Sequence, residues 1–156
     1  MGDRAVITTS KDLSGVGVYL HWAGNRTYIE GYLAYCECKR FRKPEDDPYG
    51  WAYLACIVAN SFGDGMSVGV DLCSRLDYDN RDNGVYVIKD WRIVDRLYRP
   101  GDEYYETNIS LSDVLREIEA DQPPKLRLTA DDWVRFHAIE ADIIKARENS
   151  TSGSKS

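Results

Sequence analysis

Residues 15–27 read GVGVYLHWAGNRT, and the order of residue types in this stretch predicts how the first half of the chain folds. The apolar part over 16–22 predicts a strand, and the glycine-containing turn after it leads into a helix over about 26–40. Asn25 suits the N-cap of that helix, because its side chain can accept a hydrogen bond from a free backbone amide. Amides at a helix start can also hold an anion, and Arg26 places a guanidinium beside them. We therefore expect an anionic or nucleotide-like ligand at this turn.

The predicted ligand site joins this turn to a polar loop over 77–84, provided that the fold places the two side by side. Gly24 lets a backbone approach closely, His21 offers a polar edge, and Trp22 offers a stacking face. In the alternative, which the pattern favours slightly, these three residues only stabilise the fold. The stretch matches neither a phosphate loop nor a dinucleotide fingerprint. The full candidate set is His21, Trp22, Gly24, Asn25, Arg26, Thr27, Asp82 and Asn83.

Metal binding and catalysis find little support in the sequence. The four cysteines, Cys36, Cys38, Cys56 and Cys73, lack the paired spacing of a zinc site, so we expect buried reduced thiols. The carboxylates over 77–84 lack the central glycine and the final bidentate Glu of a calcium loop, which indicates a solvated turn. No serine or cysteine stands in a nucleophile motif, and the two histidines lie far apart in the sequence. We expect no metal, no cofactor and no catalytic residue.

The pattern predicts four strands and four helices in the order β-β-α-α-β-β-α-α. The strands are expected over 5–9, 16–22, 66–73 and 85–94, and the helices over 26–40, 49–62, 110–120 and from 130 onward. The helix over 49–62 is apolar almost all round, which predicts a central, buried position. Asn83-Gly84 predicts a hairpin turn between the last two strands. A break in alternation at Lys89-Asp90 predicts a bulge.

Grouped strands and grouped helices are typical of an α+β fold. We expect a small, mainly antiparallel sheet packed on one side by about four helices. Residues 1–148 are expected to form a single domain, and the Ser/Gly-rich residues 149–156 a disordered tail.

Composition narrows the classes of partner. The 156 residues carry a formal net charge of −6, which argues against direct nucleic-acid binding. No apolar run approaches the roughly 20 residues needed to cross a bilayer, and the first residues do not resemble a secretion signal. We therefore expect a cytoplasmic protein with no membrane partner. Tyr104-Tyr105 indicates an exposed binding surface or an edge strand. Apolar surface in the aromatic strand region and on the last helix favours a homo-oligomer.

Three motifs resemble a group of small proteins from bacteriophages and other mobile elements. They are YLHWAGNR over 19–26, YGWA over 49–52 and DNGVYVIKDW over 82–91, and the resemblance covers about 15–99. Members of the group tend to read Leu-His-Trp-Asn-Gly-Gly-Arg-Asp at the turn, where this chain has Ala23, Asn25 and Thr27 in place of their Asn, second Gly and Asp. The resemblance implies an accessory protein that counters host defence.

Two mechanisms fit this context, and a third is less favoured. The protein could bind and sequester a nucleotide-like or other anionic signal without catalysis. Alternatively, it could act as an acidic inhibitor that docks on a host nucleic-acid-binding protein, as anti-CRISPR proteins do. A phosphoester hydrolase would need a metal or a general base that the sequence does not display.

Overall fold

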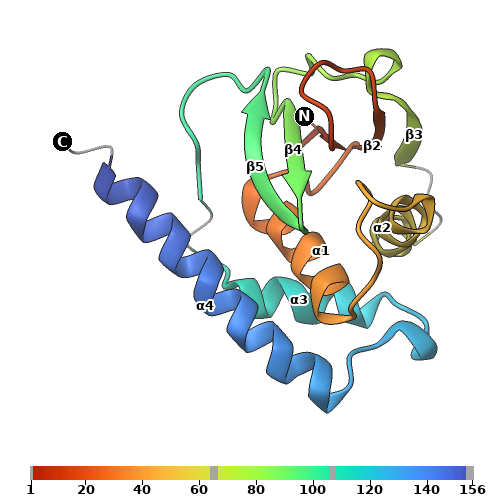
Figure 1. The fold of residues 1–156 in the computed structure, drawn as a ribbon, viewed down its shortest axis with the longest axis vertical. Coiled ribbons are helices and arrows are strands. Elements are labelled where there is room, and N and C mark those ends of the chain that lie inside the picture. Colours follow the sequence, from red (N-terminus) through yellow and green to blue (C-terminus); the bar gives the residue numbers. More distant parts are fainter. Residues whose placement is uncertain (1, 64–66, 106–107, 154–156) are drawn as a thin grey trace.

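The computed structural model describes residues 2–63, 67–105 and 108–153, and it shows an α+β fold as expected (Figure 1). The strands are β1 (Ala5–Thr8), β2 (Val16–Leu20), β3 (Val68–Leu72), β4 (Val85–Lys89) and β5 (Arg92–Leu97). The helices are α1 (Arg26–Cys38), α2 (Pro48–Asn60), α3 (Leu111–Ala120) and α4 (Ala130–Gly153). The order agrees with the prediction apart from one additional strand.

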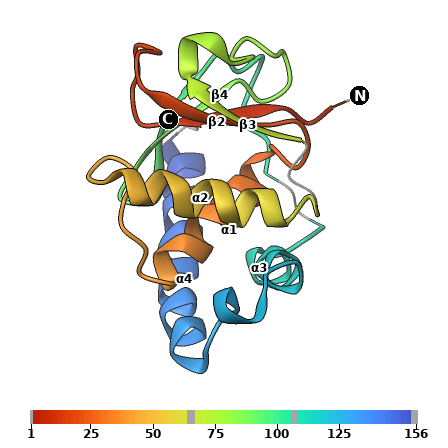
Figure 2. The same ribbon diagram turned by 90° about the vertical axis from the view of Figure 1, so that its right-hand side faces the viewer.

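The five strands form one mixed sheet in the order β3-β2-β1-β4-β5. The pair β1–β4 is parallel, and the other three pairs are antiparallel, so the sheet is mainly antiparallel. Figure 2 shows the sheet as one layer with the helices beneath it. Its other face carries a small apolar cluster of Val6, Cys73, Val85 and Val87, packed by side chains that include Leu13 and Leu76 from the connecting loops.

The central helix is α1, and the prediction that residues 49–62 would be central is wrong. Ten of the 13 residues of α1 are buried, and the helix packs against α2, α3 and α4. In α2 only Gly50, Leu54, Ile57 and Val58 are buried, while the side chain of Tyr49 is 58% exposed. The apolar residues of α2 that are not buried are largely alanines and tyrosines, and these tolerate a surface position because they are small or carry a polar tip.

The predicted strand over 85–94 is a hairpin. Asp90 and Trp91 have φ values of 53° and 62°, and they form the two-residue turn between β4 and β5. Positive φ at both positions matches the right-handed twist of the flanking strands. The irregularity lies between Val87 and Ile88, not at Lys89-Asp90 as predicted.

Asn83-Gly84 does not form the predicted hairpin, because β3 and β4 are separated in the sheet by β2 and β1. The side chain of Asn80 organises this loop instead. Its Oδ1 accepts hydrogen bonds from the amides of Asp82, Asn83 and Gly84, at 2.9 to 3.1 Å. Gly84 has a φ of +64°, so the loop uses its conformational freedom without pairing the neighbouring strands.

The helix termini follow the expected capping chemistry. Asn25 Oδ1 accepts from the amide of Tyr28, Asp47 caps α2 ahead of Pro48, and Ser110 forms a capping box on α3. Helix α4 continues through Gly153 and so includes the first residues of the tail expected over 149–156. Residues 154–156 lie outside the described part of the chain, as does Met66 at the start of the predicted third strand.

Candidate functional site

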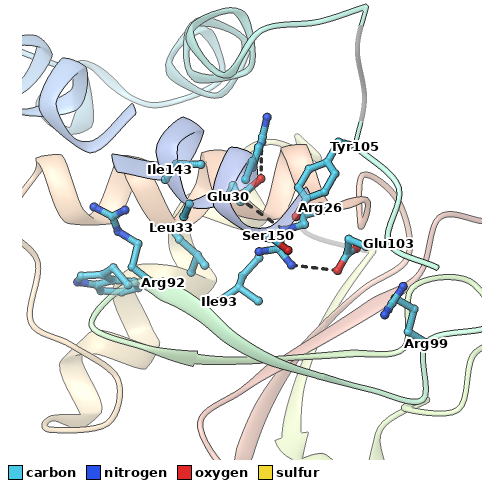
Figure 3. A pocket seen from close by; sticks show the side chains of 13 residues that line it. Arg26, Glu30, Leu33, Arg92, Ile93, Arg99, Glu103, Tyr105, Ile143 and Ser150 are labelled. Atoms are coloured by element: carbon cyan, nitrogen blue, oxygen red, sulfur yellow. Dashed lines mark hydrogen bonds and ion pairs between the residues drawn. The ribbon is translucent and has the colours of Figure 1, made fainter. Parts of the chain in front are cut away.

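A cavity of about 320 Å³ lies where α1, α4, β5 and the segment after β5 meet (Figure 3). Four arginines and two glutamates line it: Arg26, Arg92, Arg99, Arg147, Glu30 and Glu103. The remaining wall is mostly apolar or aromatic and includes Leu33, Trp91, Ile93, Tyr105 and Ile143. The cavity therefore combines cationic and apolar surface in a protein that is acidic as a whole.

Two carboxylates pair with Arg26 and Arg147 of this cavity. Arg26 Nη1 donates to Glu103 Oε2 at 2.9 Å, and Arg96 donates to the same carboxylate. Glu30, one turn along α1 from Arg26, accepts a hydrogen bond from Arg147 of α4. Arg26 Nε lies 3.8 Å from Glu30 Oε2. These ion pairs tie α1 to α4 and to the segment that follows β5.

The two carboxylates have pKa values that move in opposite directions. Burial raises the pKa of Glu30 above its ordinary value, although Arg147 and Arg26 act against this. Burial also acts to raise the pKa of Glu103, but Arg96 and Arg26 outweigh it and lower that pKa. The difference follows from the partners, because two guanidiniums contact Glu103 whereas one forms a close contact with Glu30.

Aromatic rings contact the guanidinium groups of Arg26, Arg96 and Arg147. The ring of Tyr105 lies 5.3 Å from the guanidinium carbon of Arg26 and 4.9 Å from that of Arg147. Arg96 stacks over Tyr86 at 3.7 Å, and the Tyr86 hydroxyl donates to the carbonyl of Gly24 at 2.8 Å. Cation–π contacts of this kind hold a guanidinium without consuming its hydrogen-bond donors.

Several guanidinium donors in this region are buried and have no acceptor among the described residues. Arg99 Nε and Nη1 are both of this type, as are Arg26 Nε and Arg96 Nε. Arg99 takes part in no ion pair with any described residue. A buried donor left unsatisfied costs about 1–3 kcal/mol, and more when the group is charged. Oxygen acceptors, from an anion or from water, would satisfy these donors.

The residues of the predicted ligand site are distributed over three places, and only Arg26 lines the cavity. His21 lies in a shallow depression with Tyr19, Ser67 and Gly69, and its Nδ1 is 2.9 Å from the Tyr19 hydroxyl. Trp22 is 45% exposed and contacts the His21 ring edge-on. Thr27 is buried inside the first turn of α1.

The other four residues of that set meet around the N-terminal segment. Asn25 donates from its backbone amide and its Nδ2 to Asp3 Oδ2, at 3.3 and 3.2 Å. Asn83 Nδ2 donates to Asp3 Oδ1 at 2.6 Å. A Cβ on Gly24 would lie 2.4 Å from the carbonyl oxygen of Asp3. The turn and the loop over 77–84 do lie side by side, and the carboxylate that contacts both belongs to the chain itself.

Asp82 completes this arrangement. It accepts from Arg4 Nε at 2.7 Å and from the Arg4 amide at 3.1 Å. Gly24, Asn25, Asp82 and Asn83 therefore all contact residues 3–5.

Most of the cavity was not predicted from the sequence. Arg92, Arg99 and Arg147 come from three separate segments, so no local spacing links them. The available signals were Glu30 at position i+4 from Arg26, and the expectation that Tyr104-Tyr105 forms a binding surface. Tyr104 is 65% exposed, and Tyr105 lines the cavity.

The cysteines form no disulfide, and three of the four are buried as expected. Cys56 on α2 is exposed, which corrects the prediction for that residue. Among the described residues, no group of three or more His, Cys, Asp or Glu side chains is arranged to hold a metal ion. In the same part of the chain, no helix is long and apolar enough to span a membrane.

Comparison with models of protein families, with curated proteins and with solved structures finds no match to this chain.

Proposed function

We propose that this protein binds a small anionic molecule in the arginine-lined cavity and holds it without catalysis. The observation that supports this is Arg99, which brings two buried and unpaired N–H donors to a cavity that Arg26 also lines. A guanidinium matches carboxylate and phosphate oxygens in a two-pronged geometry. A bound anion would satisfy donors that the described residues leave without acceptors.

The role that follows is sequestration of a nucleotide-like signal in the host cytoplasm. The resemblance to phage and mobile-element proteins supports this role, because it implies a protein that counters host defence. Removal of a signalling molecule requires affinity and no turnover. The anion site is proposed at the cavity rather than at the glycine turn, since the Asp3 carboxylate already contacts the amide of Asn25 there. Binding to a host defence protein remains the competing proposal.

The direct test is an NMR titration with inorganic phosphate at constant ionic strength, following the Nε–Hε signals of the arginine side chains. We expect the signals of Arg99 and Arg26 to shift together and to saturate. The reference is the signal of Arg75, whose side chain is 70% exposed. Arg75 follows β3, which lies at the opposite edge of the sheet from β5. Its shift should be small and should not saturate.

The matched variants are Arg99→Ala and Arg75→Ala, which remove one guanidinium each. Loss of charge-assisted hydrogen bonds at Arg99 should weaken phosphate binding about tenfold or more. Arg75→Ala should leave the affinity unchanged. Phosphate shifts of equal size at Arg75 and Arg99, matched by chloride, would refute the proposed site and favour the competing proposal of a macromolecular target.

A further inference from the structure

We infer that the ligand of this cavity is a phosphomonoester dianion that also carries hydroxyl groups and a flat ring, which is the chemistry of a nucleoside monophosphate. This inference rests on the proposed function, because it assigns a ligand class to the same cavity. Two independent features carry it: the number of uncompensated positive charges and the apolar wall beside them.

The charges around Arg26 favour two negative charges on the ligand. Arg26 and Arg96 share the single carboxylate of Glu103, and Arg99 pairs with no described carboxylate. Glu30 also lies 3.8 Å from Arg26, but its charge is balanced by that of Arg147 on α4. Among the described residues, the three guanidiniums and the Glu103 carboxylate therefore leave a surplus of two positive charges. A phosphomonoester carries between about −1.5 and −2 at pH 7, whereas a carboxylate, sulfonate or phosphodiester carries one charge.

The surplus lies at one side of the cavity. Figure 3 shows Arg26, Arg99, Glu103 and Tyr105 toward one side of the view, and Leu33 and Arg92 toward the other. Arg92 does not add to the surplus, because it donates to both oxygens of Glu37, at 2.8 and 3.2 Å. A dianion is therefore expected beside Arg99, with the rest of the ligand directed toward Arg92.

The apolar part of the lining suits a ring. It includes Leu33, Ile93, Ile143 and Trp91, and the Trp91 Nε1 donates to the carbonyl of Phe41 at 3.1 Å, which fixes the orientation of the indole. A rigid apolar wall favours a flat apolar group over a flexible polar one, because less ordering is needed on binding. Glu30 lies between the two regions in Figure 3 and can accept a hydrogen bond from a hydroxyl of the ligand.

The test is calorimetric titration of the full chain with four probes that separate the two features. Inorganic phosphate reports the anion site alone. Phenyl phosphate adds a ring, methyl phenyl phosphate keeps the ring but carries one charge, and adenosine 5′-monophosphate adds the hydroxyls. We expect the ring to tighten binding about tenfold over phosphate, since it buries apolar area. The monoanionic ester should bind at least tenfold more weakly than phenyl phosphate, and the nucleotide should bind most tightly.

Two variants separate the contributions of the two walls. Arg99→Ala should weaken phosphate and phenyl phosphate by the same factor. Ile93→Ala should weaken phenyl phosphate and leave phosphate unchanged. Arg75→Ala should alter neither affinity, and thermal unfolding of each variant checks that it is folded. The comparison among probes on the unmodified protein gives a result even if a variant does not fold.

Failure of this inference differs from failure of the proposed function. If phosphate does not bind, the proposed function is wrong. If phosphate binds but the ring adds nothing, or if the monoanionic ester binds as tightly as the dianion, only the ligand class is wrong. Tighter binding of a phosphotyrosyl peptide than of the nucleotide would also overturn the inference, and would indicate a protein ligand.

Discussion

Gly24 shows how a residue typical of ligand contact can be required by packing. A Cβ at this position would lie 2.4 Å from the Asp3 carbonyl oxygen and 2.8 Å from the Ala5 Cβ, and the Gly24 amide donates to that same carbonyl at 2.8 Å. The N-terminal segment therefore lies against the turn at a distance that only glycine allows. The glycine of this motif is explained by the chain's own backbone.

We predict that Gly24→Ala lowers the free energy of unfolding by about 1–3 kcal/mol, because the added methyl group meets backbone atoms that cannot move independently. Gly69→Ala is the matched control, since its Cβ would meet no atom closer than 3.9 Å. Urea denaturation followed by circular dichroism measures both. Equal urea midpoints for the two variants would contradict this explanation of Gly24.

The four cysteines should differ sharply in reactivity. Cys36, Cys38 and Cys73 are buried, and burial raises the pKa of Cys38 to about 12. Cys56 is exposed on α2. A thiol reacts as the thiolate, so both low exposure and a raised pKa slow the reaction. We predict that a disulfide-exchange reagent modifies one thiol of the native protein quickly, and that Cys56→Ser removes this fast phase. A fast phase that persists in Cys56→Ser would show that a second cysteine is accessible.

At the scale of elements, the contact between α1 and α3 depends on Gly31. A Cβ at this position would lie 2.5 Å from Val114 Cγ1 on α3. Glycine costs a helix about 1 kcal/mol relative to alanine. Its presence in the middle of α1 therefore indicates that the close approach of α3 outweighs the lost helix propensity.

A double-mutant cycle tests this contact. Gly31→Ala should lower the free energy of unfolding by about 1–2 kcal/mol, because overpacking exceeds the gain in helix propensity. Val114→Ala alone should also be destabilising, since it removes buried methyl groups. The double variant should be more stable than the sum of the two changes predicts. Strict additivity of the two single effects would show that the residues do not press against each other.

The elements that could be predicted from the sequence are those whose signals are local. The cap at Asn25 was identified correctly, because a cap is decided by a few consecutive residues. The pairing of strands could not be predicted, since β1 lies beside β4, which is far away in the sequence. Burial of α2 was wrongly predicted because hydrophobicity alone does not reveal which helix lies between the sheet and the other helices.

The candidate cavity belongs to the whole molecule, which explains why one residue of the predicted site contributes to it. Arg26, Arg92, Arg99 and Arg147 are brought together by the packing of α1, β5 and α4 and by the path of the chain after β5. They come from α1, β5, α4 and the segment after β5, so no single element places them together. Arginine clusters of this kind are visible only once the tertiary structure is known.

Self-association stays a prediction, to be measured by sedimentation.

Acid stability is a property of the whole fold, because carboxylates throughout the chain take part in ion pairs. Asp132 joins the start of α4 to the end of α1: its Oδ2 accepts from Lys39 Nζ at 3.0 Å and from the Thr129 amide at 2.9 Å. Burial acts to raise the pKa of Asp132, but these hydrogen bonds outweigh it and lower that pKa below its ordinary value. The stabilising effect of Asp132 is then complete above the pKa of the unfolded chain, about 4, and is lost as the pH falls further through the folded value.

We therefore predict that the free energy of unfolding falls between pH 5 and pH 3, and that Asp132→Asn reduces this dependence. At pH 7 the variant should be less stable by about 1–3 kcal/mol, since a charge-assisted hydrogen bond to Lys39 is lost. Glu30 acts in the opposite sense, because its raised pKa makes protonation favour the folded state as the pH falls. Asp131→Asn, a change at the exposed neighbouring acid, is the matched control and should leave the wild-type dependence intact. If urea midpoints between pH 7 and pH 3 are the same for Asp132→Asn and Asp131→Asn, the junction between α1 and α4 does not depend on the charge of Asp132.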